Sequence, residues 1–161
     1  MNYLIRRARL EDMQAVMRAH KLSIEEMCSK DYSPFQISKW ADVNYQKEIW
    51  EKSVNSDLHY VIEVDGVIEG FCHSKVHENG DGEIKGLYFT KKLSGKGIGR
   101  EVFDLSMKFL EENHCSQVFI FGTKTAKGFY ERMGFKEVEP TIIHVRGADL
   151  ECFKMLKSPL K

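Results

Sequence analysis

Apolar residues recur at steps of three and four positions in several parts of the chain, which is the spacing that one face of an α-helix requires. This pattern predicts helices at about 10–29, 34–54, 98–113 and 126–133. Ser33 followed by Pro34 marks the start of the second region, because Ser caps a helix N-terminus and Pro fits its first turn. One long helix and two shorter helices that meet near Asp42 are both compatible with the pattern of that region.

Short runs rich in β-branched and aromatic residues predict the strands. Seven such runs lie at about 3–7, 58–64, 67–76, 83–89, 118–121, 136–145 and 150–156. Asp65-Gly66 separates the second run from the third, and this dipeptide is a strong signal for a two-residue hairpin between antiparallel strands. In the fourth run the apolar positions change parity around Gly86, which a strand buried on both faces explains as well as a β-bulge does.

The fourth and fifth strands are joined by a glycine-rich loop and a helix, a βαβ connection that makes them parallel. The hairpin signals make the other neighbouring strands antiparallel. We therefore expect an α/β fold with a mixed, mostly antiparallel seven-stranded sheet, flanked by about four helices, with strands 4 and 5 parallel around a cleft. A chain of 161 residues suits a single domain, here 1–161.

Composition narrows the class of protein. Lys plus Arg and Asp plus Glu each number 24, so the formal charge is zero and does not favour nucleic acid or an acidic membrane as a partner. No apolar run approaches the roughly 20 residues that span a bilayer. The cysteines are widely spaced without C-x-x-C, and the histidines form no H-E-x-x-H, so no metal site is expected. We expect a soluble, cytoplasmic protein with reduced cysteines, most of them in its core.

The loop after the fourth strand has the spacing G-x-G-x-G, formed by Gly95, Gly97 and Gly99. Glycines leave main-chain N–H groups uncovered beside the positive end of a helix dipole, so a phosphate can rest on the backbone there. An ordinary glycine-rich turn is the alternative. The loop lacks the last interval of the dinucleotide motif G-x-G-x-x-G and the Gly-Lys-Ser/Thr ending of a P-loop.

Two stretches together resemble the GNAT superfamily of acetyl-coenzyme A-dependent N-acetyltransferases. In that family a strand leads into Gln/Arg-x-x-Gly-x-Gly/Ala at a helix start, and Gly97 and Gly99 match this motif. A later family pattern, Asn-x-x-Ala-x-x-Phe-Tyr-x-x-x-Gly-Phe, is matched by Ala126, Phe129, Tyr130, Gly134 and Phe135. The chain departs from the usual family residues at Lys91, Ser94 and Thr123. These departures leave the backbone N–H groups of the loop in place.

The resemblance implies acetyl-CoA (coenzyme A) as cosubstrate. The residues that it places on the cofactor are Leu87, Tyr88, Phe89, Ser94, Gly95, Lys96, Gly97, Ile98, Gly99, Arg100, Thr123, Lys127 and Phe129. Glu83 aligns with a catalytic glutamate that takes the amine proton, directly or through water, and Tyr130 resembles the tyrosine that protonates the departing thiolate. Without the resemblance, a charged residue at a strand start and a core tyrosine explain the same two positions. The oxyanion is expected to bind a main-chain N–H near Phe89.

The acceptor is expected to lie between the Cys28–Trp40 segment and the strand ends near Glu83, because that segment resembles one wall of the acceptor cleft in a GNAT subgroup. The residues expected to bind it are Tyr32, Gln36, Trp40 and His144. Packing of the aromatic residues on the sheet is the alternative. His73 and His144 are auxiliary base candidates, or ordinary strand histidines.

The expected reaction is transfer of acetyl from acetyl-CoA to a primary amine of a small molecule, by direct attack in a ternary complex. A non-catalytic sensor that binds CoA thioesters is one alternative, and a protein or peptide N-acetyltransferase is another. The resemblance is also compatible with a homodimer, because GNAT domains frequently dimerise.

Overall fold

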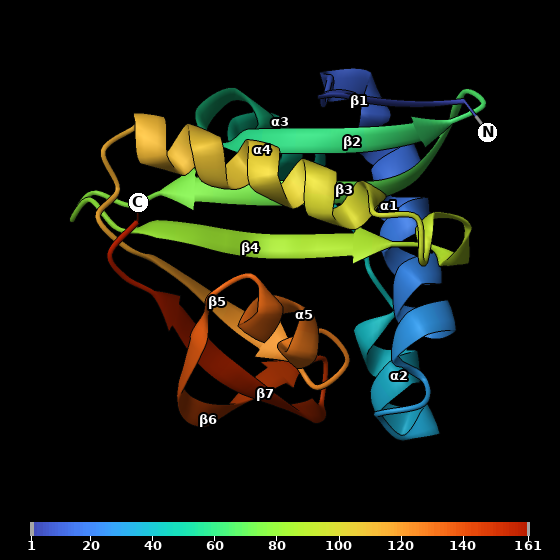
Figure 1. Ribbon diagram of the computed structural model, residues 1–161. Helices are drawn as coiled ribbons and strands as arrows, with labels where there is room; N and C mark the ends of the chain where they lie inside the picture. Colours follow the sequence, from blue (N-terminus) through green and yellow to red (C-terminus); the bar gives the residue numbers. More distant parts are fainter. Residues whose placement is uncertain (1, 161) are drawn as a thin grey trace.

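The computed structural model describes residues 2–160, which contain one seven-stranded sheet (Figure 1). Its strands are β1 (Tyr3–Arg7), β2 (Leu58–Val64), β3 (Val67–Val76), β4 (Gly82–Phe89), β5 (Val118–Thr123), β6 (Lys136–Val145) and β7 (Ala148–Lys157). Their order in the sheet is β1-β2-β3-β4-β5-β7-β6, with β4 and β5 parallel and the other neighbours antiparallel. The prediction of a mixed, mostly antiparallel sheet is confirmed.

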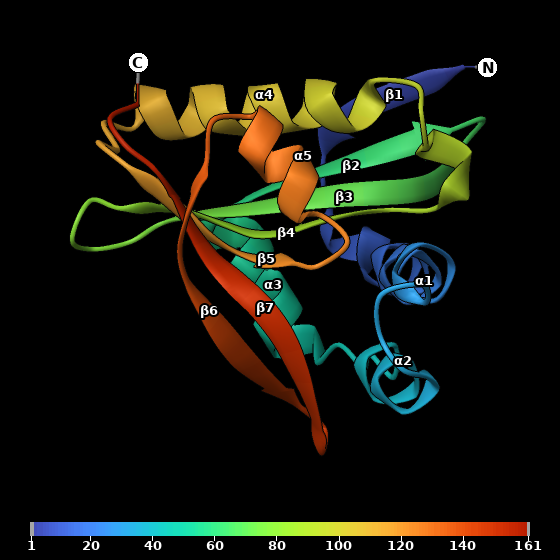
Figure 2. The ribbon, with the colours of Figure 1, turned by 60° about the horizontal axis from the view of Figure 1, so that its bottom comes forward.

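Five α-helices flank the sheet within the described residues. They are α1 (Met13–Ser23), α2 (Pro34–Trp40), α3 (Lys47–Ser56), α4 (Ile98–Glu112) and α5 (Lys127–Arg132). Figure 2 shows α4 and α5 on one face of the sheet and α1, α2 and α3 on the other. The second helical region stops after Trp40 and resumes at Lys47, so of the two alternatives it forms two shorter helices, and the described residues hold five helices where about four were expected. None of the helices in residues 2–160 is long and apolar enough to cross a membrane.

The start of α2 agrees with the prediction from Ser33 and Pro34. The Ser33 hydroxyl accepts a hydrogen bond from Gln36 N at 3.1 Å, and Gln36 Oε1 accepts one from Ser33 N at 2.8 Å. This reciprocal capping box satisfies two backbone N–H groups that a helix start otherwise leaves unpaired. It also engages the Gln36 side chain, which was expected to face an acceptor.

A β-bulge interrupts β4 at Lys85. His73 of β3 lies opposite Gly86, whereas the next residue, Ser74, lies opposite Ile84, so Lys85 is the extra residue. The bulge accounts for the change of apolar parity around Gly86 in the sequence. Beyond it β4 leaves β5, because the two strands pair only over residues 82–84, and Figure 1 shows them diverging from there. The sheet is therefore open between β4 and β5 along residues 86–89.

The main hydrophobic core lies between the sheet and α4. Its buried residues include Val102 and Phe103 of α4 and Ile84 of β4. On the other face of the sheet, two smaller buried clusters form around Trp40 of α2 and Trp50 of α3. All four cysteines are free and buried, which confirms their predicted place in the core.

Candidate active site

Two main-chain N–H groups of β4 face the opening between β4 and β5. Thr90 N donates to Glu69 O of β3 at 2.9 Å, which fixes the alternation of the antiparallel ladder. By that alternation the N–H groups of Leu87 and Phe89 face away from β3, toward the side where β5 no longer pairs. Unpaired N–H donors that face a cavity can bind the carbonyl oxygen of a ligand.

A cavity of about 150 Å³ lies at this opening, and we call it the gap cavity. It is lined by Ser23, Met27, Cys28, Leu87, Tyr88, Phe89, Thr123, Thr125, Ala126, Phe129 and Tyr130. Of the residues assigned to the cofactor or to catalysis, the fold brings together here Leu87, Tyr88, Phe89, Thr123, Phe129 and Tyr130. The lining residues that the sequence did not assign to the cofactor or to catalysis include Met27 and Cys28, which belong to a π-helical turn that extends α1 over Ile24–Cys28. Such widened turns are frequent at functional sites.

The glycine loop lies between the end of β4 and the N-terminus of α4. Gly95 and Gly97 have φ angles of 73° and 75°, and Gly97 is the N-cap residue of α4. A Cβ built on either glycine meets no atom within 4 Å, so the backbone is accessible to a ligand. Ser94, Lys96 and Arg100 are exposed around it. The other two loop residues assigned to the cofactor, Ile98 and Gly99, are buried in the first turn of the helix.

Tyr130 is buried and borders the gap cavity. Its ring packs with those of Phe103 and Phe135, at centroid separations of 6.1 and 6.0 Å. Burial raises the pKa of Tyr130 well above its ordinary value, because the phenolate is disfavoured away from water. The hydroxyl therefore carries its proton at neutral pH and is available as a donor.

Glu83 and Lys127 are outside the described residues that line the gap cavity. Glu83 is buried near the start of β4, where its Oε1 bonds His77 Nε2 at 2.8 Å. Lys127 Nζ bonds Glu137 Oε1 at 2.9 Å and lies over the Phe153 ring. A contact of Lys127 with a cofactor would thus compete with an existing ion pair.

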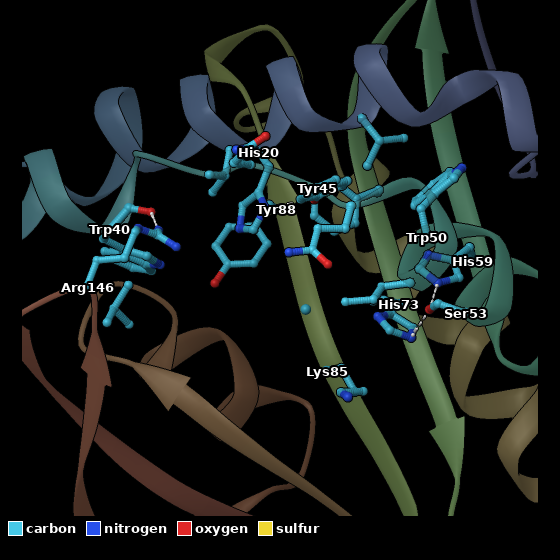
Figure 3. A pocket seen from close by; sticks show the side chains of 18 residues that line it. His20, Trp40, Tyr45, Trp50, Ser53, His59, His73, Lys85, Tyr88 and Arg146 are labelled. Atoms are coloured by element: carbon cyan, nitrogen blue, oxygen red, sulfur yellow. Dashed lines mark hydrogen bonds between the residues drawn. The ribbon is translucent and has the colours of Figure 1, made fainter.

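A larger cavity of about 500 Å³ lies on the face of the sheet that α1, α2 and α3 cover (Figure 3), and we call it the wide cavity. It is lined by Val16, His20, Trp40, Val43, Asn44, Tyr45, Gln46, Ile49, Trp50, Ser53, His59, Phe71, His73, Lys85, Gly86, Tyr88, Val145 and Arg146. Tyr88 borders both the wide cavity and the gap cavity. The two spaces therefore adjoin each other at the open part of β4.

Trp40, one of the residues predicted to bind the acceptor, lines the wide cavity. Tyr32 lies behind it, with the two rings 5.3 Å apart at their centroids. The Tyr32 hydroxyl donates to Glu151 O at 2.6 Å and accepts from Lys124 N at 3.0 Å. Tyr32 thus fixes the position of Trp40 and lies outside the described lining of either cavity.

Gln36 and His144 were also expected to bind the acceptor, but within the described structure neither is among the residues that line the gap cavity or the wide cavity. Gln36 caps α2 and its Nε2 donates to Asp149 O at 2.7 Å. His144 is exposed on β6 and bonds Asp149 through its ring nitrogen. Adjacent residues of a strand point to opposite faces, so it is the next residue, Val145, that lines the wide cavity.

Three histidines line the wide cavity, of which only His73 was a candidate from the sequence. His59 of β2 and His73 of β3 lie opposite each other in the sheet, and their rings stack with centroids 3.8 Å apart (Figure 3). His73 Nε2 bonds Asp57 Oδ2 at 2.8 Å and Ser53 Oγ at 3.2 Å. No group of three His, Cys, Asp or Glu that could hold a metal ion occurs in residues 2–160.

Burial lowers the pKa of these histidines. The pKa of His20 falls to about 4, with a smaller contribution from the charge of Arg146, and the pKa of His59 falls to about 3. Burial also lowers the pKa of His73, although the bonded carboxylate of Asp57 opposes this shift. The three rings are therefore mostly neutral at pH 7, and burial makes each of them a weaker base than a histidine in water.

Comparison with known proteins places this geometry in a family. The chain matches the family model "Acetyltransferase (GNAT) domain" over residues 28–155. It is 25% identical over 158 residues to the uncharacterized N-acetyltransferase YafP of Escherichia coli K12, covering 98% of this chain and 97% of that one. It is 30% identical over 80 residues to the uncharacterized N-acetyltransferase CT2212 of Chlorobaculum tepidum, covering 50% of each chain.

Solved structures share the fold. A GCN5-related N-acetyltransferase from Rhodopseudomonas palustris superposes with a TM-score of 0.86 at 21% identity, covering 98% of this chain and 96% of that one. The PaiA N-acetyltransferase of Thermoplasma acidophilum, crystallised in complex with coenzyme A, has a TM-score of 0.79 at 22% identity. The match covers 98% of this chain and 99% of that one. Because the family model matches most of the chain, the protein belongs to the GNAT acetyltransferase family.

Proposed function

We propose that this protein is an N-acetyltransferase that moves the acetyl group of acetyl-CoA to the primary amine of a small molecule, by direct attack in a ternary complex. One observation carries the proposal: the N–H groups of Leu87 and Phe89 face an opening beside two cavities that share Tyr88. Acetyl transfer needs such an arrangement, because donor and acceptor have to meet where the carbonyl oxygen is held.

Acetyl-CoA would bind through the glycine loop and the gap cavity. The N–H groups of residues 95–100, at the positive end of α4, would hold the pyrophosphate, and the accessible backbone at Gly95 and Gly97 suits that role. The thioester end would enter the gap cavity between Phe89 and Phe129, with its carbonyl oxygen on the N–H of Leu87. The departures from the family pattern in the loop do not remove these main-chain donors.

The acceptor would occupy the wide cavity. Its volume of about 500 Å³ falls within the usual range for small-molecule sites. Trp40, Tyr45 and Trp50 supply aromatic walls for the apolar part of a ligand. An amine at the Tyr88 side of this cavity would lie next to the acetyl group in the gap cavity.

Two groups are candidates for removing the proton of the amine. Glu83 lies four residues before Leu87, or about 13 Å along an extended strand, so it would act through water. His73 lines the wide cavity opposite Gly86 and is held by Asp57, an arrangement that suits a general base.

Tyr130 is the proposed acid that protonates the coenzyme A thiolate as it leaves. It borders the gap cavity and keeps its proton at neutral pH, because burial raises its pKa. Protonating the thiolate makes it a better leaving group and completes the proton transfer that begins at the amine.

Release of coenzyme A thiol from acetyl-CoA, with and without a panel of amines, tests the proposal. We expect amine-dependent release that slows by ~10²-fold in Tyr130→Phe, with little change in acetyl-CoA affinity. Binding of acetyl-CoA without amine-dependent release would contradict the enzyme and favour a CoA-thioester sensor. Acetylation of peptides or proteins alone would contradict the small-molecule acceptor.

A further inference from the structure

The wide cavity carries unbalanced positive charge. Among its described lining residues, Lys85 and Arg146 are the ones with side chains charged at neutral pH, and both are cations. Lys85 is the bulge residue of β4, and Arg146 lies in the turn between β6 and β7 (Figure 3). Neither forms an ion pair with a carboxylate of residues 2–160. A cavity with two unpaired cations favours an anionic group on its ligand.

Two carboxylates whose charges act on His73 of the lining are engaged by histidines. Asp57 Oδ2 bonds His73 Nε2 at 2.8 Å, and Glu83 Oε1 bonds His77 Nε2 at 2.8 Å. Both acids lie outside the described lining of the wide cavity. A cationic ligand would therefore have no free carboxylate of the lining to pair with.

Arg146 is oriented by the end of α2. Its Nε donates to Lys39 O and its Nη2 donates to Trp40 O, both at 2.7 Å. A guanidinium has five N–H donors, so others remain for a ligand. The positive charge of Arg146 also lowers the pKa of His20, so its field reaches the cavity interior. An oriented guanidinium suits a carboxylate, which it can bind through two parallel hydrogen bonds.

We infer that the acceptor is a primary amine that also carries a carboxylate, bound by Arg146 with help from Lys85. The inference rests on the proposed acetyl transfer and narrows its substrate class to amino acids with an apolar side chain, and to related amine carboxylates. The apolar part packs on Trp40, Tyr45 and Trp50. Polyamines are disfavoured, because each additional ammonium group would be repelled by the two cations.

A matched acceptor panel tests the inference by thiol release. It contains phenylalanine and leucine, the amines that they give on decarboxylation, phosphoethanolamine and spermidine. We expect kcat/KM to be at least tenfold higher for the amino acids than for their decarboxylated amines. Faster turnover of the decarboxylated amines, of phosphoethanolamine or of spermidine than of the amino acids would overturn the carboxylate assignment while leaving acetyl transfer intact. Thiol release with none of the amines would contradict acetyl transfer itself, and the inference with it.

Two variants locate the proposed contact. Arg146→Gln should raise the KM for the amino acid at least tenfold and leave the KM for acetyl-CoA unchanged. Because Arg146 also anchors α2, the exposed Lys85 provides a second variant, Lys85→Gln, which should raise the same KM severalfold without affecting the fold. Arg9→Gln is the control, since Arg9 is exposed and outside the described lining of both cavities. An amino-acid KM that is the same in all three variants as in the wild type would overturn the inference.

Discussion

The ring of Phe89 fills the space in which a side chain on Gly99 would begin: a Cβ built on Gly99 lies 2.5 Å from Phe89 Cζ and 2.8 Å from Cε1. Phe89 is the last residue of β4, and Gly99 lies in the first turn of α4. This contact sets how closely the strand end approaches the helix start. The positions of the β4 N–H groups and of the glycine loop therefore depend on the same packing contact.

Gly99→Ala is expected to destabilise the fold by about 1–3 kcal/mol and to weaken acetyl-CoA binding, because Phe89 or α4 has to move aside. Chemical denaturation measures the first effect and calorimetry the second. Gly128→Ala is the matched control, since its Cβ would meet only the flexible Arg132 side chain, at 3.4 Å, and alanine favours helix. Stability of Gly99→Ala equal to that of the wild type would contradict the close packing.

Gly97→Val should raise the dissociation constant of acetyl-CoA at least tenfold, or about 1.4 kcal/mol, because a branched side chain would cover the backbone N–H groups. Gly97 has a φ of 75°, so the substitution also strains the fold. Gly80→Val controls for that strain: Gly80 has a φ of 91° in a turn that joins β3 to β4, with no atom within 4 Å of a built Cβ. Equal acetyl-CoA affinity in the two variants would rule out the loop as the phosphate site.

The variants Glu83→Gln and His73→Gln distinguish the two candidate bases. The variant that removes the base should lose ~10²-fold in rate at neutral pH and recover as the pH rises toward the pKa of the amine. Tyr130→Phe should lose rate without such recovery, because it removes the acid. Steady-state rates between pH 6 and 10 provide the measurement. Wild-type turnover in all three variants would require the chemistry to lie elsewhere.

Acidification should destabilise the protein through His59. Burial lowers the folded-state pKa of His59 to about 3, whereas the unfolded chain takes up a proton near the ordinary value of ~6.5. The contribution of neutral His59 to the free energy of unfolding is therefore fully present above pH ~6.5. It declines as the pH falls toward 3, by about 2 kcal/mol at pH 5. Urea denaturation at pH 7 and pH 5 measures it, with His59→Asn expected to reduce the difference.

An identical loss of stability on acidification in wild type and His59→Asn would contradict the assignment to His59.

Local signals in the sequence predicted most of the fold. The Asp65-Gly66 hairpin fixed the limits of β2 and β3, Leu58–Val64 and Val67–Val76, as the structure has them. Ser33 marked the start of α2, because its hydroxyl accepts a hydrogen bond from a backbone N–H three residues later. Such features depend on neighbours along the chain, so the sequence alone specifies them.

The wide cavity depends on features that the sequence does not reveal locally. The hairpin at 65–66, continued without a bulge, would put Cys72 opposite His59, but an extra residue at Glu69 places His73 there instead. A shift of one residue exchanges the faces of a strand, so the histidine pair could not be predicted. The bond from the Gln36 amide to Asp149 O could not be predicted for a related reason, because the two residues are 113 positions apart in the chain.

Mass spectrometry of the reaction products tests the central claim most directly. The protein would be incubated with acetyl-CoA that carries an isotope-labelled acetyl group, together with an apolar amino acid or its decarboxylated amine. The account predicts the labelled acetyl group on the amine nitrogen, in equal amount to the coenzyme A released, and much less of it with Tyr130→Phe. Intact labelled acetyl-CoA recovered from a stable complex, with every amine unmodified, would contradict it.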